Sequence, residues 1–233
     1  MIKSEFVEIE NFMLDKMRDC AHDKHHVYRV LNSALDIANH TDTADPDVLI
    51  AACLLHDIGR DAQSADLELC HAEIGGDMAY DFLLSRGWTP QKALHVKDCI
   101  STHRFRRDNT PVSIEAKILF DSDKLDSAGA TGIARTLVYG GQILEPLYIQ
   151  DEDGKIIVDG GGAEISSFFQ EYNYKLKNVY NTFFTDRAKE IAATRQKTAI
   201  DFYEALYAEV TDNYEGGLKA YVGLSDDRLF PEM

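Results

Sequence analysis

The sequence predicts an all-α protein, a bundle of helices interrupted by a short irregular or hairpin insertion near residues 139–162. Apolar residues recur with helical spacing over most of the chain. Glycines at 140–141 and 160–162 enclose the one region that lacks this spacing. With 233 residues and a hydrophobic content of 45%, the chain is long enough to bury a sizeable core in one domain.

The first part of the chain is predicted to form a succession of helices with apolar residues at positions i, i+3, i+4 and i+7. In the second of these helices, His26 borders the stripe that contains Val27 and Val30, so its side chain is expected to face the core. The alternative is a core histidine that binds no ligand. The expected helices cover residues 4–19, 24–40, 45–59, 64–84, 90–103 and 114–120.

The most apolar stretch runs from Val48 to Leu55 and contains no charged residue. The dipeptide Asp45-Pro46 is a helix-start signal, and Gly59 is interpreted as a stop. A helix that is apolar on nearly every side is buried. His56 and Asp57 stand at its last turn, where polar groups are rare unless they are paired or bound to metal. The alternative is that this pair caps the helix C-terminus.

The last part of the chain is predicted to form two long helices, at about 164–183 and 186–210. The first of them is rich in aromatic residues, and an aromatic stripe at helical spacing is usually part of a core. Residues 1–211 are therefore expected to form a single domain, followed by a loosely ordered tail over 212–233.

The composition restricts the partners and the compartment. A formal net charge of −16 argues against binding to long nucleic acid or to an anionic membrane surface. A small phosphorylated substrate needs only a local basic pocket. Four scattered cysteines without a C-x-x-C pattern favour reduced thiols in a cytoplasmic protein. No apolar run approaches the roughly 18 residues of a membrane span, and the acidic N-terminus is unlike a signal peptide.

Residues of metal-ligand type recur at core-facing positions of separate predicted helices. They are His26, His56 with Asp57, and Asp123, which lies four residues after Leu119 on a buried face. A buried centre with two imidazoles and two carboxylates makes physical sense if a divalent cation cancels its charge. Mixed nitrogen and oxygen ligands suit Mn, Fe, Co, Ni and Zn, and Mg also fits. The sequence contains no nucleophile motif and no P-loop.

This order of residues in a helical chain resembles the HD-domain metal-dependent phosphohydrolases. The resemblance rests on the segments HDKHHVYRV, LLHDIGR, HAEIGG, FDSDKLDSAGATGIAR and SFFQEYNYKLK, and it extends from about residue 20 to residue 210. It implies an HD core over about 22–130 and C-terminal helices over 163–210. The segments are similar to a bacterial branch in which some members are similar to nucleoside triphosphate pyrophosphohydrolases.

The resemblance also implies roles for individual residues. The metal ligands it implies are His26, His56, Asp57 and Asp123. Catalytic roles are expected for Asp57, Lys124, His71 and His103, and substrate binding is expected for Arg29, Arg60, Arg104 and Arg107. The alternative for the arginines that follow His103 is a solvated basic helix end.

The expected activity is metal-dependent hydrolysis of a small phosphorylated metabolite, a nucleoside triphosphate that yields a monophosphate and pyrophosphate. A bound metal activates water and polarises the phosphate. The alternatives are a nucleotide phosphomonoesterase or phosphodiesterase, or a regulatory nucleotide-binding module with a structural metal. One divalent ion rather than two is expected, because arginines follow His103 and no bridging carboxylate is evident near His71. Mn is expected to be the best activator. The sequence leaves the oligomeric state open.

Overall fold

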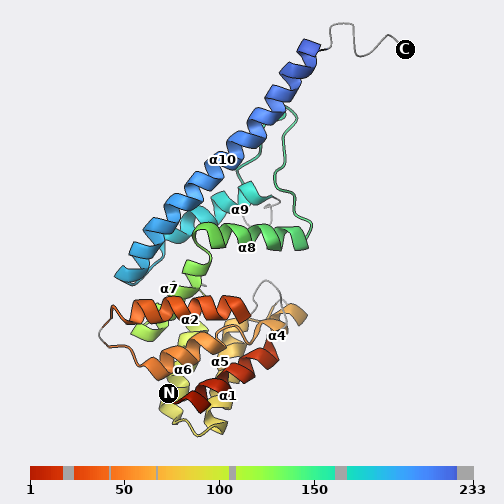
Figure 1. The fold of residues 1–233 in the computed structure, drawn as a ribbon. Coiled ribbons are helices and arrows are strands. Elements are labelled where there is room, and N and C mark those ends of the chain that lie inside the picture. The colour runs from red at the N-terminus through yellow and green to blue at the C-terminus, as the bar shows by residue number, and fades with distance from the viewer. Residues whose placement is uncertain (18–23, 42, 67, 105–108, 161–166, 225–233) are drawn as a thin grey trace.

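The computed structural model describes residues 1–17, 24–41, 43–66, 68–104, 109–160 and 167–224 (Figure 1). Over these residues the protein is helical, and its only extended pairing is an isolated antiparallel bridge between Gln150 and Ile156. The bridge closes a turn inside the expected insertion. The all-α prediction is confirmed. None of the helices in the described ranges is both long and apolar enough to cross a membrane.

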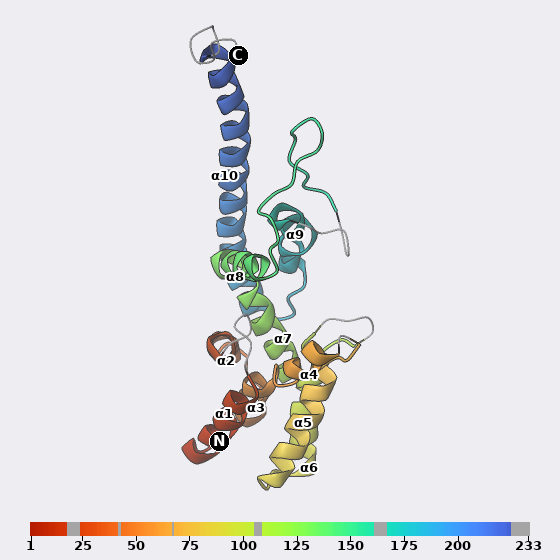
Figure 2. The same cartoon turned by 90° about the vertical axis from the view of Figure 1, so that its right-hand side faces the viewer.

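The helices are α1 Lys3–Lys16, α2 Lys24–Ala38, α3 Pro46–Leu55, α4 Arg60–Ala65, α5 His71–Ser85, α6 Pro90–Thr102, α7 Ile114–Asp126, α8 Gly129–Gln142, α9 Phe168–Tyr174, the 3₁₀ helix η2 Leu176–Asn181 and α10 Asp186–Leu224. Helices α1 to α6 gather at one end of the molecule, whereas α8, α9 and α10 lie at the other (Figures 1 and 2). Helix α7 spans the two parts.

Helix α3 is the centre of the larger core. Its residues Val48, Leu49 and 51–55 are buried, as expected for a helix without charges. Asp45 accepts hydrogen bonds from the backbone amides of Asp47 and Val48, and this cap starts the helix. The surrounding helices α1, α2, α5, α6 and α7 contribute most of the remaining apolar side chains of this core, and Ile58, Phe183 and the α10 residues Ala188 and Ala192 complete it.

A second, smaller core lies in the other part of the molecule. It contains Ile133 of α8, Phe168 and Tyr172 of α9, Leu176 of η2 and Ala199 of α10. The aromatic residues near 168–172 are therefore core residues, as predicted. Two hydrophobic cores rather than one thus flank the end of α7.

The boundaries in this second part differ from the prediction. The helix expected over 164–183 is divided into α9 and η2, and residues 161–166 lie outside the described ranges. The side-chain amides of Asn173 and Asn178 donate to the carbonyls of Phe169 and Tyr174, and such bonds compete with regular helix formation. Helix α10 continues to Leu224 instead of ending near 210, because no proline interrupts it.

Asp121 of α7 fixes the start of α10. Its buried carboxylate accepts hydrogen bonds from the backbone amides of Phe184 and Thr185, at 2.9 and 2.7 Å, and from the Thr185 hydroxyl at 2.6 Å. These donors lie at the helix N-terminus, where backbone amides lack partners within the helix. One buried side chain therefore ties the second part of the molecule to the first.

Candidate metal centre

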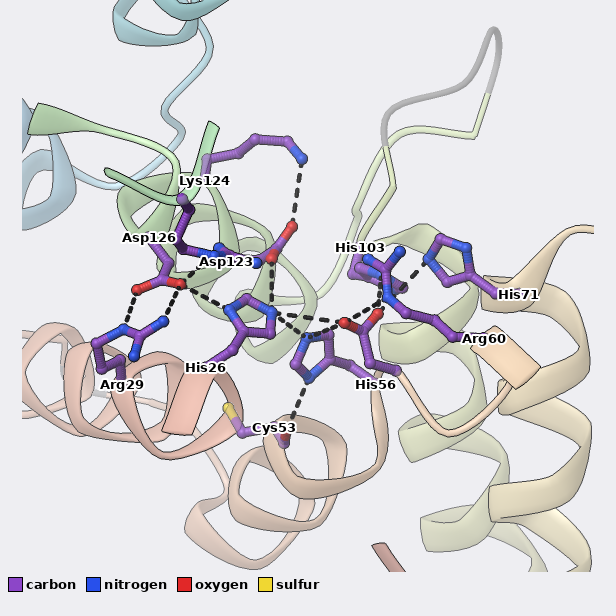
Figure 3. Close-up of polar contacts among 12 residues, drawn as sticks. His26, Arg29, Cys53, His56, Arg60, His71, His103, Asp123, Lys124 and Asp126 are labelled. Carbon is purple, nitrogen blue, oxygen red and sulfur yellow. Dashed lines mark hydrogen bonds and ion pairs between the residues drawn. The ribbon is translucent and has the colours of Figure 1, made fainter. Parts of the chain in front are cut away.

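The four predicted ligands meet at the junction of α2, α3 and α7 (Figure 3). His26 Nε2 lies 3.2 Å from His56 Nε2, 3.4 Å from Asp123 Oδ1 and 3.5 Å from Asp57 Oδ2. His26, His56 and Asp57 are buried, and the Asp123 side chain is 15% exposed. Residues that are far apart in the sequence therefore form one polar centre at the edge of the larger core.

His71 and His103 extend this centre on its other side. Their Nε2 atoms lie 3.6 and 3.7 Å from Asp57 Oδ1. The described residues form two groups whose ligand atoms lie within 4.8 Å of one another, namely His26, His56 and Asp123, and Asp57, His71 and His103. The expectation that no bridging carboxylate lies near His71 is wrong, because the fold places Asp57 between the two groups.

Each of the four imidazoles has an acceptor at Nδ1. The acceptors are the Cys53 carbonyl for His56 at 2.8 Å, the Ile100 carbonyl for His103 at 2.6 Å, Gln63 Oε1 for His71 at 2.6 Å and Asp126 Oδ2 for His26 at 2.7 Å. An acceptor at Nδ1 requires the proton on that nitrogen. In the neutral ring the lone pair of Nε2 then faces the centre, as metal binding requires.

The donor set fits a divalent cation. Both carboxylate oxygens of Asp57 and the Nε2 atom of His71 are buried without a hydrogen-bond partner. Arg60 Nε lies 2.7 Å from Asp57 Oδ2, as an ion pair without hydrogen-bond geometry. Buried polar groups normally have partners. A cation bound by nitrogen and oxygen ligands would supply the missing partner for the Asp57 oxygens and for His71 Nε2.

The pKa values suit such a centre. Burial lowers the pKa of His56 to about 4, and burial together with Arg60 lowers that of His71 to about 3, so both rings are neutral at pH 7. Burial opposes ionisation of Asp57, yet His56 and Arg60 hold its pKa well below the ordinary value. Burial also opposes the charge of His26, but Asp126 and Asp57 outweigh it and raise its pKa to about 9.

Asp126 is the residue of this centre that the sequence analysis missed. Its buried carboxylate accepts from His26 Nδ1 at 2.7 Å, from Arg29 Nε at 2.6 Å and from Arg135 Nη1 at 2.6 Å. Asp126 follows Asp123 by three residues, so the two share a face of α7. That spacing was the available sequence signal.

Two of the predicted substrate residues, Arg60 and Arg104, and the predicted catalytic residue Lys124 lie beside the metal centre. Arg60, Arg104 and Lys124 line a cavity of about 790 Å³ between the two parts of the molecule. Each also contacts the centre: Arg60 through Asp57 at 2.7 Å, Arg104 through His71 at 3.3 Å and Lys124 through Asp123 at 3.3 Å. The cavity therefore opens onto the predicted ligands through three cations.

The other two predicted substrate residues are not placed in this cavity. Arg29 pairs with Asp126 behind His26 and lines a separate pocket of about 510 Å³. The ion pair holds Arg29 on the far side of the ligands from this cavity (Figure 3), and its role as a substrate residue stays a prediction. Arg107 lies outside the described residues.

Gly59 brings the two ligand groups together. A Cβ atom at Gly59 would lie 2.3 Å from the His71 carbonyl oxygen and 2.7 Å from the Gly75 nitrogen. Its φ of −86° is accessible to any residue, so glycine is required for space rather than for conformation. Gly59 is thus a point of close contact with α5 rather than a simple helix stop, and this contact brings His71 to Asp57.

Residues 24–128 match the HD domain family. The chain is similar to the uncharacterized protein YpgQ of Bacillus subtilis (strain 168), with 28% identity over 193 residues that cover 81% of this chain and 84% of the relative. The crystal structure of YpgQ in complex with ADP has a TM-score of 0.67 at 24% identity, over 88% of this chain and 97% of that one. A predicted HD superfamily hydrolase from an uncultured Thermotogales bacterium has a TM-score of 0.60 at 28% identity, over 89% and 92%.

Proposed function

Because residues 24–128 are an HD domain, the chain belongs to the HD superfamily of metal-dependent phosphohydrolases, and from this premise we propose that it hydrolyses nucleoside triphosphates to a monophosphate and pyrophosphate. The observation that carries the proposal is the position of Arg60, Arg104 and Lys124. Each lines the large cavity and also contacts a residue of the metal centre. Three cations beside a metal centre suit a polyphosphate group better than a neutral substrate.

The nucleotide part of the proposal has two supports. The relative YpgQ has been crystallised with ADP. The cavity volume of about 790 Å³ lies within the range of roughly 300 to 1,000 Å³ that is common for small-molecule sites. A nucleotide could therefore place its phosphates at the metal centre and its nucleoside against the opposite wall.

The chain's own residues then have distinct tasks. A divalent ion bound by His26, His56, Asp57 and Asp123 would supply an activated water and polarise the phosphoryl group. Lys124, Arg60 and Arg104 would neutralise the phosphate oxygens. Asp57 would orient the attacking water, and His71 and His103 would accept hydrogen bonds from that water at Nε2.

The direct test is product analysis after the metal has been removed and replaced by Mn, Co, Ni or Mg. Nucleoside triphosphates, monophosphate esters and cyclic diesters are compared, and release of pyrophosphate from triphosphates is expected, fastest with Mn. Asp57→Ala should abolish release, whereas the exposed Asp81→Asn should not. Release of phosphate alone, or cleavage of diesters, would favour the phosphomonoesterase or phosphodiesterase alternative. Nucleotide binding without any hydrolysis would favour a regulatory module.

We also propose one tightly bound ion, at the group that contains His26. Asp57, Asp123 and Asp126 supply negative charge there, whereas His71 lies beside Arg60 and Arg104. His103→Ala should keep one metal per chain in elemental analysis and lower turnover by roughly 10- to 100-fold. Two metals per chain in the wild type and one in this variant would instead assign His103 to a second ion.

A further inference from the structure

The cavity has two chemically different ends. Three of its cations, Arg60, Arg104 and Lys124, lie on the side of the larger core, against the metal centre. Two further cations of the lining, Arg135 and Lys175, are paired with the carboxylates of Asp126 and Glu171. The opposite wall comes from α8, α9, η2 and the segment after α8, and it includes Tyr139, Tyr174 and Glu145. A triphosphate would be repelled by the carboxylate and attracted by the cations. The charge distribution therefore orients a nucleotide with its base toward α8 and α9.

Two tyrosines of this wall suit a flat aromatic ligand. Tyr139 is 52% exposed and Tyr174 is 46% exposed, although both line the cavity. Aromatic rings at a wet surface are common where a planar group stacks on them. They would hold any base, because every base has a π-face, so the choice of base requires a polar group.

Glu145 is that polar group. No described side chain or amide donates a hydrogen bond to its carboxylate, whereas the nearby Glu171 is paired with Lys175 at 2.7 Å. Burial and the charge of Glu171 raise the pKa of Glu145, as expected for an acceptor that lacks a donor. A ligand with N–H groups would therefore supply the hydrogen-bond donors that this carboxylate lacks.

The backbone around Glu145 is shaped to hold it at the cavity. The preceding Leu144 has a φ of 59°, and its side chain is 89% exposed, so its own packing does not compensate for this conformation. The Glu145 amide donates to the Gly140 carbonyl at 2.8 Å. A Cβ atom at Gly140 would lie 2.9 Å from Glu145 Oε2, so the glycine leaves room for the carboxylate against α8.

We infer that Glu145 selects guanine nucleotides by accepting two hydrogen bonds from the base, an inference that rests on the proposed function. Guanine carries two adjacent donors, the ring N1–H and the 2-amino group, which match the two oxygens of a carboxylate. On the corresponding edges adenine and cytosine place an acceptor beside their amino group, and uracil flanks its single N–H with two carbonyls. Hypoxanthine lacks only the 2-amino group, so inosine nucleotides test the contact one bond at a time.

The experiment compares kcat/KM for GTP, ITP and ATP in the wild type, in Glu145→Gln and in Glu152→Gln. The control substitution Glu152→Gln makes the same chemical change at an exposed position of the same insertion, outside the cavity lining. The wild type should prefer GTP over ITP by roughly 10-fold or more, as expected for loss of a hydrogen bond to a charged group. Glu145→Gln should lose this preference and gain on ATP, because glutamine pairs with the donor and acceptor of adenine. Glu152→Gln should match the wild type.

Equal kcat/KM for GTP and ITP in the wild type would overturn the inference, and so would a uniform loss on all three nucleotides in Glu145→Gln. Calorimetric binding of GDP, IDP and ADP to the metal-loaded protein separates this inference from the proposed function. If no triphosphate is hydrolysed but GDP binds at least 10-fold more tightly than IDP, the proposed reaction fails and the base selection stands. If triphosphates are hydrolysed without discrimination and GDP and IDP bind equally, the base selection fails and the reaction stands.

Discussion

At the scale of single residues, Asp126 decides the orientation of the His26 ring. It accepts a hydrogen bond from Nδ1 while Arg29 and Arg135 hold its carboxylate in place. Asp126→Asn removes the negative charge that fixes this tautomer, so metal affinity should fall by about 10- to 100-fold. Competition with a chelating dye measures the change, and the exposed Asp81→Asn is the matched control. Unchanged affinity in Asp126→Asn would show that His26 is oriented without it.

The proton on His26 leads to a second expectation at this scale. Its pKa is raised to about 9 in the metal-free centre, whereas burial keeps His56 and His71 neutral above about pH 4. Metal binding at pH 7 should therefore release about one proton, and the affinity should rise about tenfold per pH unit up to about pH 9. Calorimetry in buffers of different ionisation enthalpy counts the released protons. A count of zero would mean that His26 is already neutral.

In the metal-free protein the same shift acts on stability. Because the pKa of His26 is higher in the folded protein than in the unfolded chain, its protonation stabilises the folded state. This contribution is fully present below the unfolded pKa of about 6.5 and is lost as the pH rises through the folded pKa of about 9.

The four candidate ligands could be selected from the sequence, because each follows a local pattern. His56 and Asp57 end an uncharged helix, and His26 borders an apolar stripe. The role of Asp126 could not be predicted in the same way, because its partner His26 lies 100 residues earlier in the chain. Contacts over that separation depend on how the helices pack, which periodicity does not describe.

At the scale of helices, the close contact between Gly59 and α5 assembles the centre. Gly59→Ala would place a methyl group against the His71 carbonyl, so the two segments must separate. We expect destabilisation of about 1–3 kcal/mol and reduced turnover, because His71 would move away from Asp57. Urea unfolding and steady-state kinetics measure both effects.

The control for this prediction is Gly141→Ala in α8. A Cβ atom at Gly141 would meet nothing within 4 Å, so alanine there should be neutral or slightly stabilising. If Gly59→Ala were as stable and as active as this control, the tight packing against α5 would be unnecessary.

Helix existence was predicted better than helix extent. The start of α3 carries a cap and a proline, and the structure confirms both. The end of α9 carries no comparable signal, because it results from asparagine side chains that bind backbone carbonyls. The far end of α10 was placed too early, since a helix without a stop signal simply continues.

At the scale of the whole molecule, the metal centre joins elements of the larger core. Its candidate ligands come from α2, from the end of α3 and from α7. A bound ion should therefore stabilise the folded state, by about 2.7 kcal/mol at a metal concentration of 100 times Kd. Thermal unfolding with Mn and after treatment with a chelator measures this difference. Identical unfolding temperatures would show that the ligands do not bind the ion in the folded protein.

The division into two cores could not be predicted from the sequence. Helical periodicity shows which face of a helix is buried, but not which neighbour covers it. Ile133 and Leu119 look alike in the sequence, yet the first packs in the smaller core and the second in the larger one. The cavity between these cores results from that division, so the apolar periodicity of the sequence could not predict it either.

Helix α10 has a mechanical consequence for the protein. Its 39 residues correspond to a rod of about 58 Å, anchored at its first turn through Thr185 and Asp121 and projecting beyond the smaller core (Figure 1). It packs along α8 and η2, which form part of the cavity wall. A tilt of about 5° at the anchor would displace the far end by about 5 Å. A fluorophore at Tyr221, which is 54% exposed, would therefore report a small tilt of α10 at its anchor as a large displacement.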